Sequence, residues 1–343
     1  MIAISFYSVH TLCSLSRYSI EVPKHLDRAK SLHFDGPSND VWNRFYGDET
    51  VDTYINQSKT VTENNNVFVD YVRFEFFHKN SVIRIEQPTT DTRLLVSTSS
   101  FFKSTPTENG GNIYQNAGSC VQYKICCIES KRKEISGTHS LIKVTNDENH
   151  TNFILESSIT QNKGLDSILD HYYGEILFSS LNITDSKLET NAVFNSFQPH
   201  SHSITNFSNF KNISASRECC FVFFSKEQNF TFCNLIDNVV KRNNDALFQH
   251  VSATLIVSHC FFQGNKVTNI IYSHFGTHSV VQCHFDVNNT FSTDDDYINN
   301  SLSMTELTIP NLYSSDYCMP EKILTNMLED DHQVYLHARR RLF

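Results

Sequence analysis

An enzyme that acts on polysaccharides needs carboxylates set close together, either to bind calcium beside a basic group or to serve as acid and base. The chain holds 37 Asp and Glu residues, but few share a spacing that would gather them. Asp166 and Asp170 lie in one segment and could face together, whereas Asp294, Asp295 and Asp296 form a run typical of a solvated loop. No catalytic residue is therefore predicted, and a polysaccharide lyase or hydrolase is kept as the alternative function.

Thiols and imidazoles are the next candidates, with 10 Cys and 16 His in the chain. Neither a C-x-x-C pair nor an H-E-x-x-H motif occurs, so no metal site and no cofactor is predicted. Cys233, Cys260 and Cys283 recur at intervals that would stack them in successive turns of a repeat. We expect three small thiols buried in a core, because the parallel Cβ directions of stacked residues would strain a disulfide.

Eight Asn-x-Ser/Thr sequons could accept N-linked glycans in a secreted protein, against about six expected by chance from the composition. The excess favours an extracellular or cell-surface location. Asn288 is expected inside a turn of the repeat and should be a poor acceptor. The seven remaining candidates are Asn56, Asn149, Asn182, Asn206, Asn212, Asn229 and Asn299.

The net charge and the hydropathy pattern restrict the classes of partner that the chain is expected to bind. The net charge of −9 disfavours a nucleic-acid binder, so glycans or host and partner proteins are the expected ligands. The chain has no run of about 18 apolar residues, and no transmembrane segment is predicted. The apolar start, Met1 to Leu15, lacks a basic n-region and is not an evident signal peptide.

The elements that must position these residues repeat along the chain. An apolar residue, two spacers and Asn recur in five clear copies, and degenerate copies centre on Phe102, Ile128, Leu181 and Phe210. Successive anchors lie 22 to 31 residues apart, which is too short for helical-pair repeats and fits one coil of a parallel β-helix. The clear copies are Phe77-x-x-Asn80, Ile159-x-x-Asn162, Leu235-x-x-Asn238, Phe262-x-x-Asn265 and Phe285-x-x-Asn288.

Stacked coils explain the repeat physically. At a spacing of about 4.8 Å, the apolar anchors pack on one another and the Asn side chains hydrogen-bond between coils. Apolar residues recur five and three positions before the anchor, and a small one recurs two before, so a corner or bulge must change the side-chain parity. We expect an all-β, right-handed parallel β-helix of about nine coils over residues 61–290. An irregular β-sandwich with chance matches is the alternative.

The two ends lack the motif. Residues 1–60 are predicted to form an N-terminal cap or lead-in coil, and residues 291–343 a loop and a C-terminal helical cap. Met319-Pro320-Glu321 suits the first turn of that helix, and the basic end Arg339 to Arg341 suits its last turn. A basic tail that binds a partner is the other interpretation.

The Phe-x-x-Asn copies and the single Gly110-Gly111-Asn112-Ile113 resemble the FxxN and GGxI repeats of polymorphic outer-membrane-protein-like β-helices, which also occur in protist surface proteins. The resemblance covers about residues 60–290. It implies a non-enzymatic, adhesin-like surface protein, or a passenger whose anchor lies outside this chain. The GGxI element occurs once, with Asn where Ala is usual, which is a departure from that pattern.

Overall fold

The computed structural model describes residues 39–78, 81–107, 110–132, 137–190, 193–216, 220–241, 246–286, 297–299 and 305–309. The chain divides into two compact units, Met1–Glu49 and Thr50–Phe343. In the first unit, helix α1 (Asn39–Tyr46) carries the single Trp of the sequence. The ring of Trp42 packs on Tyr46 with 4.8 Å between centroids, and its Nε1 donates to the backbone oxygen of Glu49 at 2.7 Å.

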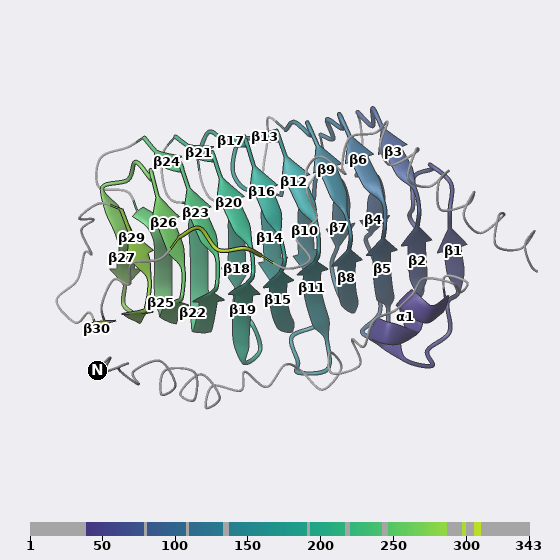
Figure 1. The fold of residues 1–343 in the computed structure, drawn as a ribbon. Helices are drawn as coiled ribbons and strands as arrows, with labels where there is room; N and C mark the ends of the chain where they lie inside the picture. The colour runs from purple at the N-terminus through teal and green to yellow at the C-terminus, as the bar shows by residue number, and fades with distance from the viewer. Residues whose placement is uncertain are drawn as a thin grey trace, which may run out of the picture. The chain divides into compact units, whose positions relative to one another are not determined.

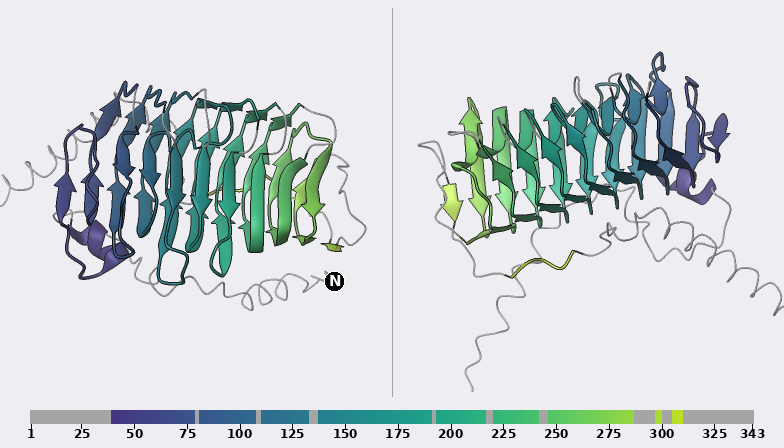
Figure 2. Two further views of the ribbon diagram at one scale, coloured as in Figure 1. Left: turned by 180° about the vertical axis from the view of Figure 1, so that it is seen from behind. Right: turned by 90° about the horizontal axis from the view of Figure 1, so that it is seen from above.

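The second unit is a parallel β-solenoid whose turns place strands on three faces (Figure 1). Figure 2 shows from behind and from above that the strands of successive turns lie side by side and run in the same direction. The first face holds β4 (Ile83–Ile85), β7 (Ile113–Gln115), β10 (Ser140–Lys143), β14 (Leu169–Tyr172), β18 (Phe194–Phe197), the first parts of β22 (Phe221–Thr231) and β25 (Ala246–Ser258), and β27 (Asn269–His274).

The other faces follow in chain order within each turn. The second face holds β1 (Thr53–Ile55), β2 (Val67–Asp70), β5 (Arg93–Ser97), β8 (Ser119–Tyr123), β11 (Thr151–Leu155), β15 (Glu175–Ser179), β19 (His202–Asn206), the second parts of β22 and β25, β28 (Thr277–Val281) and β30 (Tyr297–Asn299). The third face holds β3 (Arg73–Glu75), β6 (Ser100–Phe102), β9 (Cys126–Ile128), β12 (Ser158–Thr160), β16 (Asn182–Thr184), β20 (Asn209–Lys211), β23 (Asn234–Ile236), β26 (Phe261–Gln263) and β29 (His284–Phe285).

The solenoid makes about seven turns. Eight strands stack on the first face, from β4 to β27, and seven full turns of the chain separate the first from the last. The prediction of about nine coils was therefore too high, because it counted one coil for every anchor although the end coils are incomplete. Strands β22 and β25 run through two faces, since residues 221–224 pair with β18 and residues 227–231 pair with β19.

One residue turns the chain from the second face to the third in every coil, and we call this position the corner. The corner residues have φ between 44° and 56°, the left-handed region that side chains other than Gly, Asn and Asp seldom adopt. A buried residue follows each of them. This corner produces the predicted change of parity. The corner residues are Tyr71, Thr98, Lys124, Glu156, Ser180, Phe207, Phe232, His259 and Gln282.

The inward column of the third face fixes the register of the repeat. It consists of Phe74, Phe101, Cys127, Ile159, Ile183, Phe210, Leu235, Phe262 and Phe285. Five predicted anchors lie in this column. The other four were misplaced by one to three residues, because Phe77, Phe102, Ile128 and Leu181 neighbour the true column residues and are equally apolar.

Asn side chains link the coils just beyond this column. The Oδ1 of Asn162 accepts from the backbone N of Ser130 at 2.8 Å, and that of Asn238 from the backbone N of Ile213 at 3.1 Å. The Nδ2 of Asn238 donates to the Phe210 oxygen at 3.0 Å, and the Nδ2 of Asn265 to the Leu235 oxygen at 2.6 Å. Equivalent positions are Ser in other coils, as at Ser130. Asn80 and Asn288 lie outside the described residues.

The second-face strands β2, β5 and β8 are buried on both sides, whereas β19 and β28 alternate between buried and more exposed residues. Phe68, Leu95 and Val121 point away from the interior in successive strands, yet each has 0% of its surface exposed, as have the inward Val69 and Val96. Strands with two buried sides lose the alternation of apolar and polar residues that marks a half-exposed strand. The sequence pattern therefore gave no sign of this second buried layer.

The helix predicted near 319–336 lies outside the described residues, and the structure gives no support for a C-terminal helical cap. Residues 305–309 cross the outer side of the third face (Figure 1). There the side chain of Asn234 makes two hydrogen bonds with the backbone of Leu307, each 2.9 Å long. In the described part of the chain, no helix is long and apolar enough to cross a membrane.

Candidate ligand-binding groove

A short strand ladder follows the third face in the middle turns, made of β13 (Lys163–Gly164), β17 (Lys187–Leu188), β21 (Ser214–Ala215) and β24 (Val239–Val240). Lys163 pairs with Lys187 in this ladder, and a bridge pairs Lys131 with Lys163. The three side chains thus stand in register in successive turns, about 4.8 Å apart. We call Lys131, Lys163 and Lys187 the lysine ladder. All three are exposed, whereas Gly164 and Leu188 behind them are buried.

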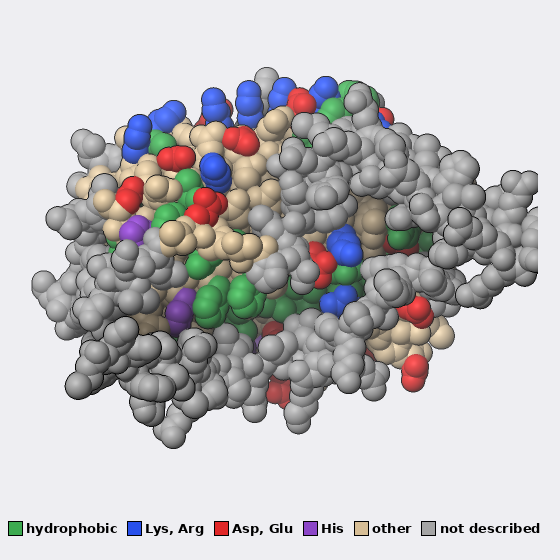
Figure 3. Space-filling view, in the orientation of Figure 1, with side chains coloured by type: hydrophobic (Ala, Val, Ile, Leu, Met, Phe, Trp, Pro, Cys, Tyr) green, Lys and Arg blue, Asp and Glu red, His purple; other side chains and the backbone are tan. Residues whose placement is uncertain are grey.

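The lysine ladder borders a groove with a volume of about 620 Å³. Among the residues that the structure describes, its lining carries five basic side chains and one acidic side chain, whereas the whole chain is negative. Figure 3 shows the Lys and Arg side chains as a row along this edge of the molecule. The charged lining residues are Lys131, Arg132, Lys163, Lys187, Lys241 and Glu189. Hydroxyl groups come from Thr105, Thr107, Ser214 and Ser216.

Arg132 brings positive charge to the floor of the groove. Arg132 is 5% exposed, and its Nη1 donates to the backbone oxygen of Gly137 at 3.3 Å. A buried guanidinium keeps its charge because its pKa exceeds 12. The groove is therefore basic at its base as well as along its edge.

Three lysines elsewhere on the solenoid stand close to acids, whereas Lys143, Lys211, Lys226, Lys241 and Lys266 form no ion pair with another described residue. Lys103 lies 4.0 Å from Glu129, Lys124 lies 3.8 Å from Glu156, and Lys59 lies 3.6 Å from Glu63. Within the described residues, none of the three lysines of the ladder forms an ion pair. Like charges placed directly opposite each other on neighbouring strands destabilise a sheet. The ladder thus holds an uncompensated row of charge that an anion would relieve.

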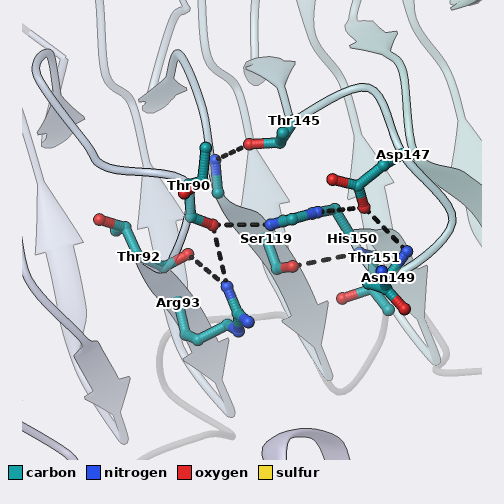
Figure 4. Close-up of polar contacts among 10 residues, drawn as sticks. Thr90, Thr92, Arg93, Ser119, Thr145, Asp147, Asn149, His150 and Thr151 are labelled. Carbon is teal, nitrogen blue, oxygen red and sulfur yellow. Dashed lines mark hydrogen bonds and ion pairs between the residues drawn. The ribbon is translucent and has the colours of Figure 1, made fainter.

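A second polar cluster joins the connections between the first and second faces in three successive turns (Figure 4). The Nδ1 of His150 lies 2.5 Å from the Oδ1 of Asp147, and its Nε2 lies 2.6 Å from the backbone oxygen of Thr90. The hydroxyl of Ser119 accepts from the backbone N of Thr151 at 3.2 Å. His150 and Asp147 therefore hold loops together. Because both nitrogens of His150 have other partners, the ring is not placed to activate Ser119.

Two of the five buried histidines that the structure describes, His139 and His171, have strongly lowered pKa values. The Nε2 of His139 lies 3.0 Å from Gln122 Oε1, and the Nε2 of His171 lies 3.0 Å from the hydroxyl of Ser140. Burial lowers the pKa of each histidine to about 3, and His139 adds a smaller lowering effect on His171. Both rings are neutral near pH 7 and fill polar positions of the core.

The predicted acidic pair is not brought together in a site. Asp170 is fully buried and accepts from the Nδ2 of Asn195 at 2.6 Å. Asp166 accepts instead from the hydroxyl of Thr190 at 3.3 Å. Asp294, Asp295 and Asp296 lie outside the described residues. Of the residues that line the groove, Glu189 alone carries a carboxylate.

The cysteine column is buried. Cys233, Cys260 and Cys283 are free thiols, and each Sγ lies 3.2 to 3.5 Å from the backbone oxygen two residues before it. Burial is the largest cause that raises the pKa of Cys260, so that thiol stays protonated and unreactive. Cys126 on the third face is disulfide-bonded.

The glycosylation candidates fall into accessible and inaccessible sets. Asn56, Asn149 and Asn212 are exposed, and Asn206 and Asn229 are half-buried. Asn182 is 5% exposed, and its amide bonds with Ser158 and Asn209 on neighbouring strands. It is therefore a poor acceptor in the folded chain, contrary to the prediction. The side chain of Asn299 and the whole of Asn288 are outside the described structure.

The lysine ladder escaped the sequence analysis. Lys131, Lys163 and Lys187 lie 32 and 24 residues apart, and they align only when the register of every coil is known. A usable signal was present: a Lys lies four residues after the column residues Cys127, Ile159 and Ile183. The sequence analysis placed Ile159 correctly in this column, but it took Ile128 for Cys127 and Leu181 for Ile183.

No protein-family model, no curated protein and no solved structure matches this chain. The parallel β-solenoid is thus established by the strand pairing, and the likeness to polymorphic outer-membrane-protein-like repeats rests on the repeat residues alone.

Proposed function

We propose that this chain is a non-enzymatic binding protein of the adhesin-like kind, which contacts glycans or partner proteins along the outside of a right-handed β-solenoid. The observation that carries the proposal is the groove beside the lysine ladder. Its lining residues come from successive turns and offer charges and hydroxyls at a regular spacing. An extended ligand that gains small contacts over several turns suits such a surface.

The alternative, a polysaccharide lyase or hydrolase, has less support from the geometry. A glycoside hydrolase needs two carboxyl groups within about 10 Å of each other across the scissile bond. Among the groove residues that the structure describes, Glu189 is the single carboxylate. Asp70 and Asp170, the buried carboxylates among the described residues, lie on different faces.

A location at the cell surface or outside the cell is part of the proposal. Three sequon asparagines, Asn56, Asn149 and Asn212, are exposed, although the Nδ2 of Asn212 donates to the Oδ1 of Asp185 at 2.6 Å. The resemblance to FxxN repeat proteins points to the same compartment. We therefore propose that the chain is a glycosylated solenoid of that family type, which is displayed at the cell surface and binds its ligands there.

Glycan-array binding with the fluorescently labelled full-length chain tests the binding proposal directly. We expect retention on a subset of glycans and no release of new reducing ends from any of them. Retention on no glycan and on no cell type, or turnover of a polysaccharide, would overturn it.

The location is tested separately on native cells. Protease applied to intact cells should remove the protein, and an endoglycosidase should increase its gel mobility. A protein that is protected from protease and unshifted by the endoglycosidase contradicts the surface location while leaving the array result to be judged by itself.

A further inference from the structure

We propose that the lysine ladder binds a linear anionic polysaccharide, one whose sulfate or carboxylate groups recur along the chain. The inference rests on the proposed binding function and names its ligand class. Lys131, Lys163 and Lys187 present one ammonium group per turn, in register and exposed. A polymer with a repeating negative charge can meet all three at once when it lies along the solenoid axis.

The charge balance favours an anionic ligand over a neutral one. The groove lining holds five basic groups against Glu189, and Arg132 is held beneath them in a buried position. In the part of the chain that the structure describes, the ladder has no acidic partner, whereas Lys59, Lys103 and Lys124 have one each. Binding would therefore add ion pairs without breaking any that exist among these residues.

The remaining lining residues favour a sugar chain over a nucleic acid. Single-stranded nucleic acids are held by aromatic side chains on which the bases stack. No described residue that lines the groove is aromatic. The lining instead offers hydroxyls from Thr105, Thr107, Ser214 and Ser216, which can exchange hydrogen bonds with sugar hydroxyls.

The groove is also less suited to an acidic peptide. Binding of a peptide usually depends on pockets for apolar side chains or on an open sheet edge. Leu188 is 2% exposed and offers little apolar surface to a ligand. The backbone of β17 is paired on both sides, with β13 and β21, and so has no open edge to offer.

Dextran sulfate and unmodified dextran provide a matched pair of probes, since they share a backbone and differ in charge. We expect the full-length chain to bind dextran sulfate and hyaluronan, measured by biolayer interferometry, and to ignore dextran. The triple variant K131Q/K163Q/K187Q should bind at least tenfold more weakly. The slope of log affinity against log salt should fall by about 2, given about 0.7 per neutralised charge on a single chain.

Two control variants separate the site from overall charge. Replacing the three lysines with Arg keeps the charge and should keep the binding. Changing Lys59, Lys143 and Lys211 to Gln removes the same charge away from the groove lining and should change the affinity less than twofold. Circular dichroism and thermal melting of each variant check that the solenoid stays folded.

The outcomes distinguish the inference from the function on which it rests. Equal losses in both Gln triple variants, or tighter binding to oligothymidylate or polyglutamate than to either polysaccharide, overturn the anionic polysaccharide. Retention of neutral glycans that the K131Q/K163Q/K187Q change leaves intact also overturns it, while supporting the proposed function. Binding to no glycan of any kind overturns both.

Discussion

The two ends of each third-face strand connect to the rest of the coil by links that differ in how much their length varies, although a residue in the left-handed region also follows eight of the nine strands directly. At the corner, a single residue in the left-handed region joins the second face to the third in all nine third-face strands. At the far end, the connection to the next first-face strand varies from 5 residues between β26 and β27 to 11 between β9 and β10. The lysine ladder lies in this variable connection. The solenoid thus keeps its register at a fixed corner and places its groove where length can change.

A one-residue insertion gives the largest expected contrast between the two connections. An Ala inserted between Phe232 and Cys233 should reverse the inward and outward sides of β23, turning Leu235 away from the interior and Asn234 and Ile236 toward it. We expect a loss of roughly 3–5 kcal/mol, comparable to removal of a large core side chain. Urea unfolding monitored by circular dichroism measures it.

The matched insertion belongs in the variable connection. An Ala inserted after Thr190, between β16 and β18, should cost less than about 1 kcal/mol because loop-closure entropy rises slowly with length. Equal losses from the two insertions would show that the corner has no special role in setting the register.

Acidification should lower the free energy of unfolding through the buried histidines of the interior. The pKa of His139 and that of His171 are both lowered to about 3 by burial, from about 6.5. Their stabilising contribution is complete above pH 6.5 and is lost as the pH falls toward 3. At about 1.4 kcal/mol per pKa unit, a change from pH 7 to pH 4.5 lowers the free energy of unfolding by about 5 kcal/mol from the two histidines.

Asp70 acts in the opposite direction. Burial raises its pKa to about 6 from 3.8, so its contribution is greatest below pH 3.8 and is lost as the pH rises through 6. Between pH 7 and pH 4.5, protonation of Asp70 raises the free energy of unfolding by about 2 kcal/mol. Together with the loss from the two histidines, the free energy of unfolding falls by about 3 kcal/mol. Urea unfolding at the two pH values measures the net change. Asp70→Asn should make the acid loss larger, and an unchanged or smaller loss in that variant contradicts the assignment.

Removal of one inter-coil amide should have an intermediate effect. Asn238 is fully buried, and Asn238→Ala leaves the backbone N–H of Ile213 and the carbonyl of Phe210 without these bonds. We expect a loss of about 1–3 kcal/mol in urea unfolding. Lys163→Gln, on the exposed ladder, should stay within about 0.5 kcal/mol. A larger effect of the lysine change would mean that the groove edge contributes to the fold.

The smallest expected effect is a gain at the corner. Thr98 has a φ of 44°, which is costly for a β-branched residue and tolerated by Asn. Thr98→Asn should therefore raise the free energy of unfolding by about 1 kcal/mol, seen as a higher melting temperature. The control is Thr254→Asn in strand β25, where no gain is expected. A destabilised Thr98→Asn would show that the side chain matters more than the backbone.

The fold class was predictable because stacking imposes a short, near-regular period on the sequence. The change of parity before each anchor was also predictable, and the corner residues produce it. The assignment of Phe207 and Phe232 to the interior was wrong, since they are corner residues that are half-buried. An apolar residue at such a position cannot be told from a core residue by spacing alone.

The candidate groove could not be predicted, because it depends on lateral alignment. A shift of one residue at Ile128 or two at Leu181 does not change the predicted fold, but it removes the correspondence between Lys131, Lys163 and Lys187. The two-sided burial of the first second-face strands was missed for a related reason. Phe68 and Leu95 lie in apolar runs, and such runs do not show whether a strand is buried on one side or on both.

The contact between Asn234 and Leu307 sets an order of assembly. The two residues are 73 positions apart, and closing a loop of that length in the unfolded chain costs about 4 kcal/mol of entropy. Once the turns through β29 have stacked, only the stretch after Phe285 must be ordered, so the closure is cheaper. Two hydrogen bonds contribute about 1–3 kcal/mol. Residues 305–309 therefore dock last on the third face, and they are the first to detach from it when the solenoid begins to unfold.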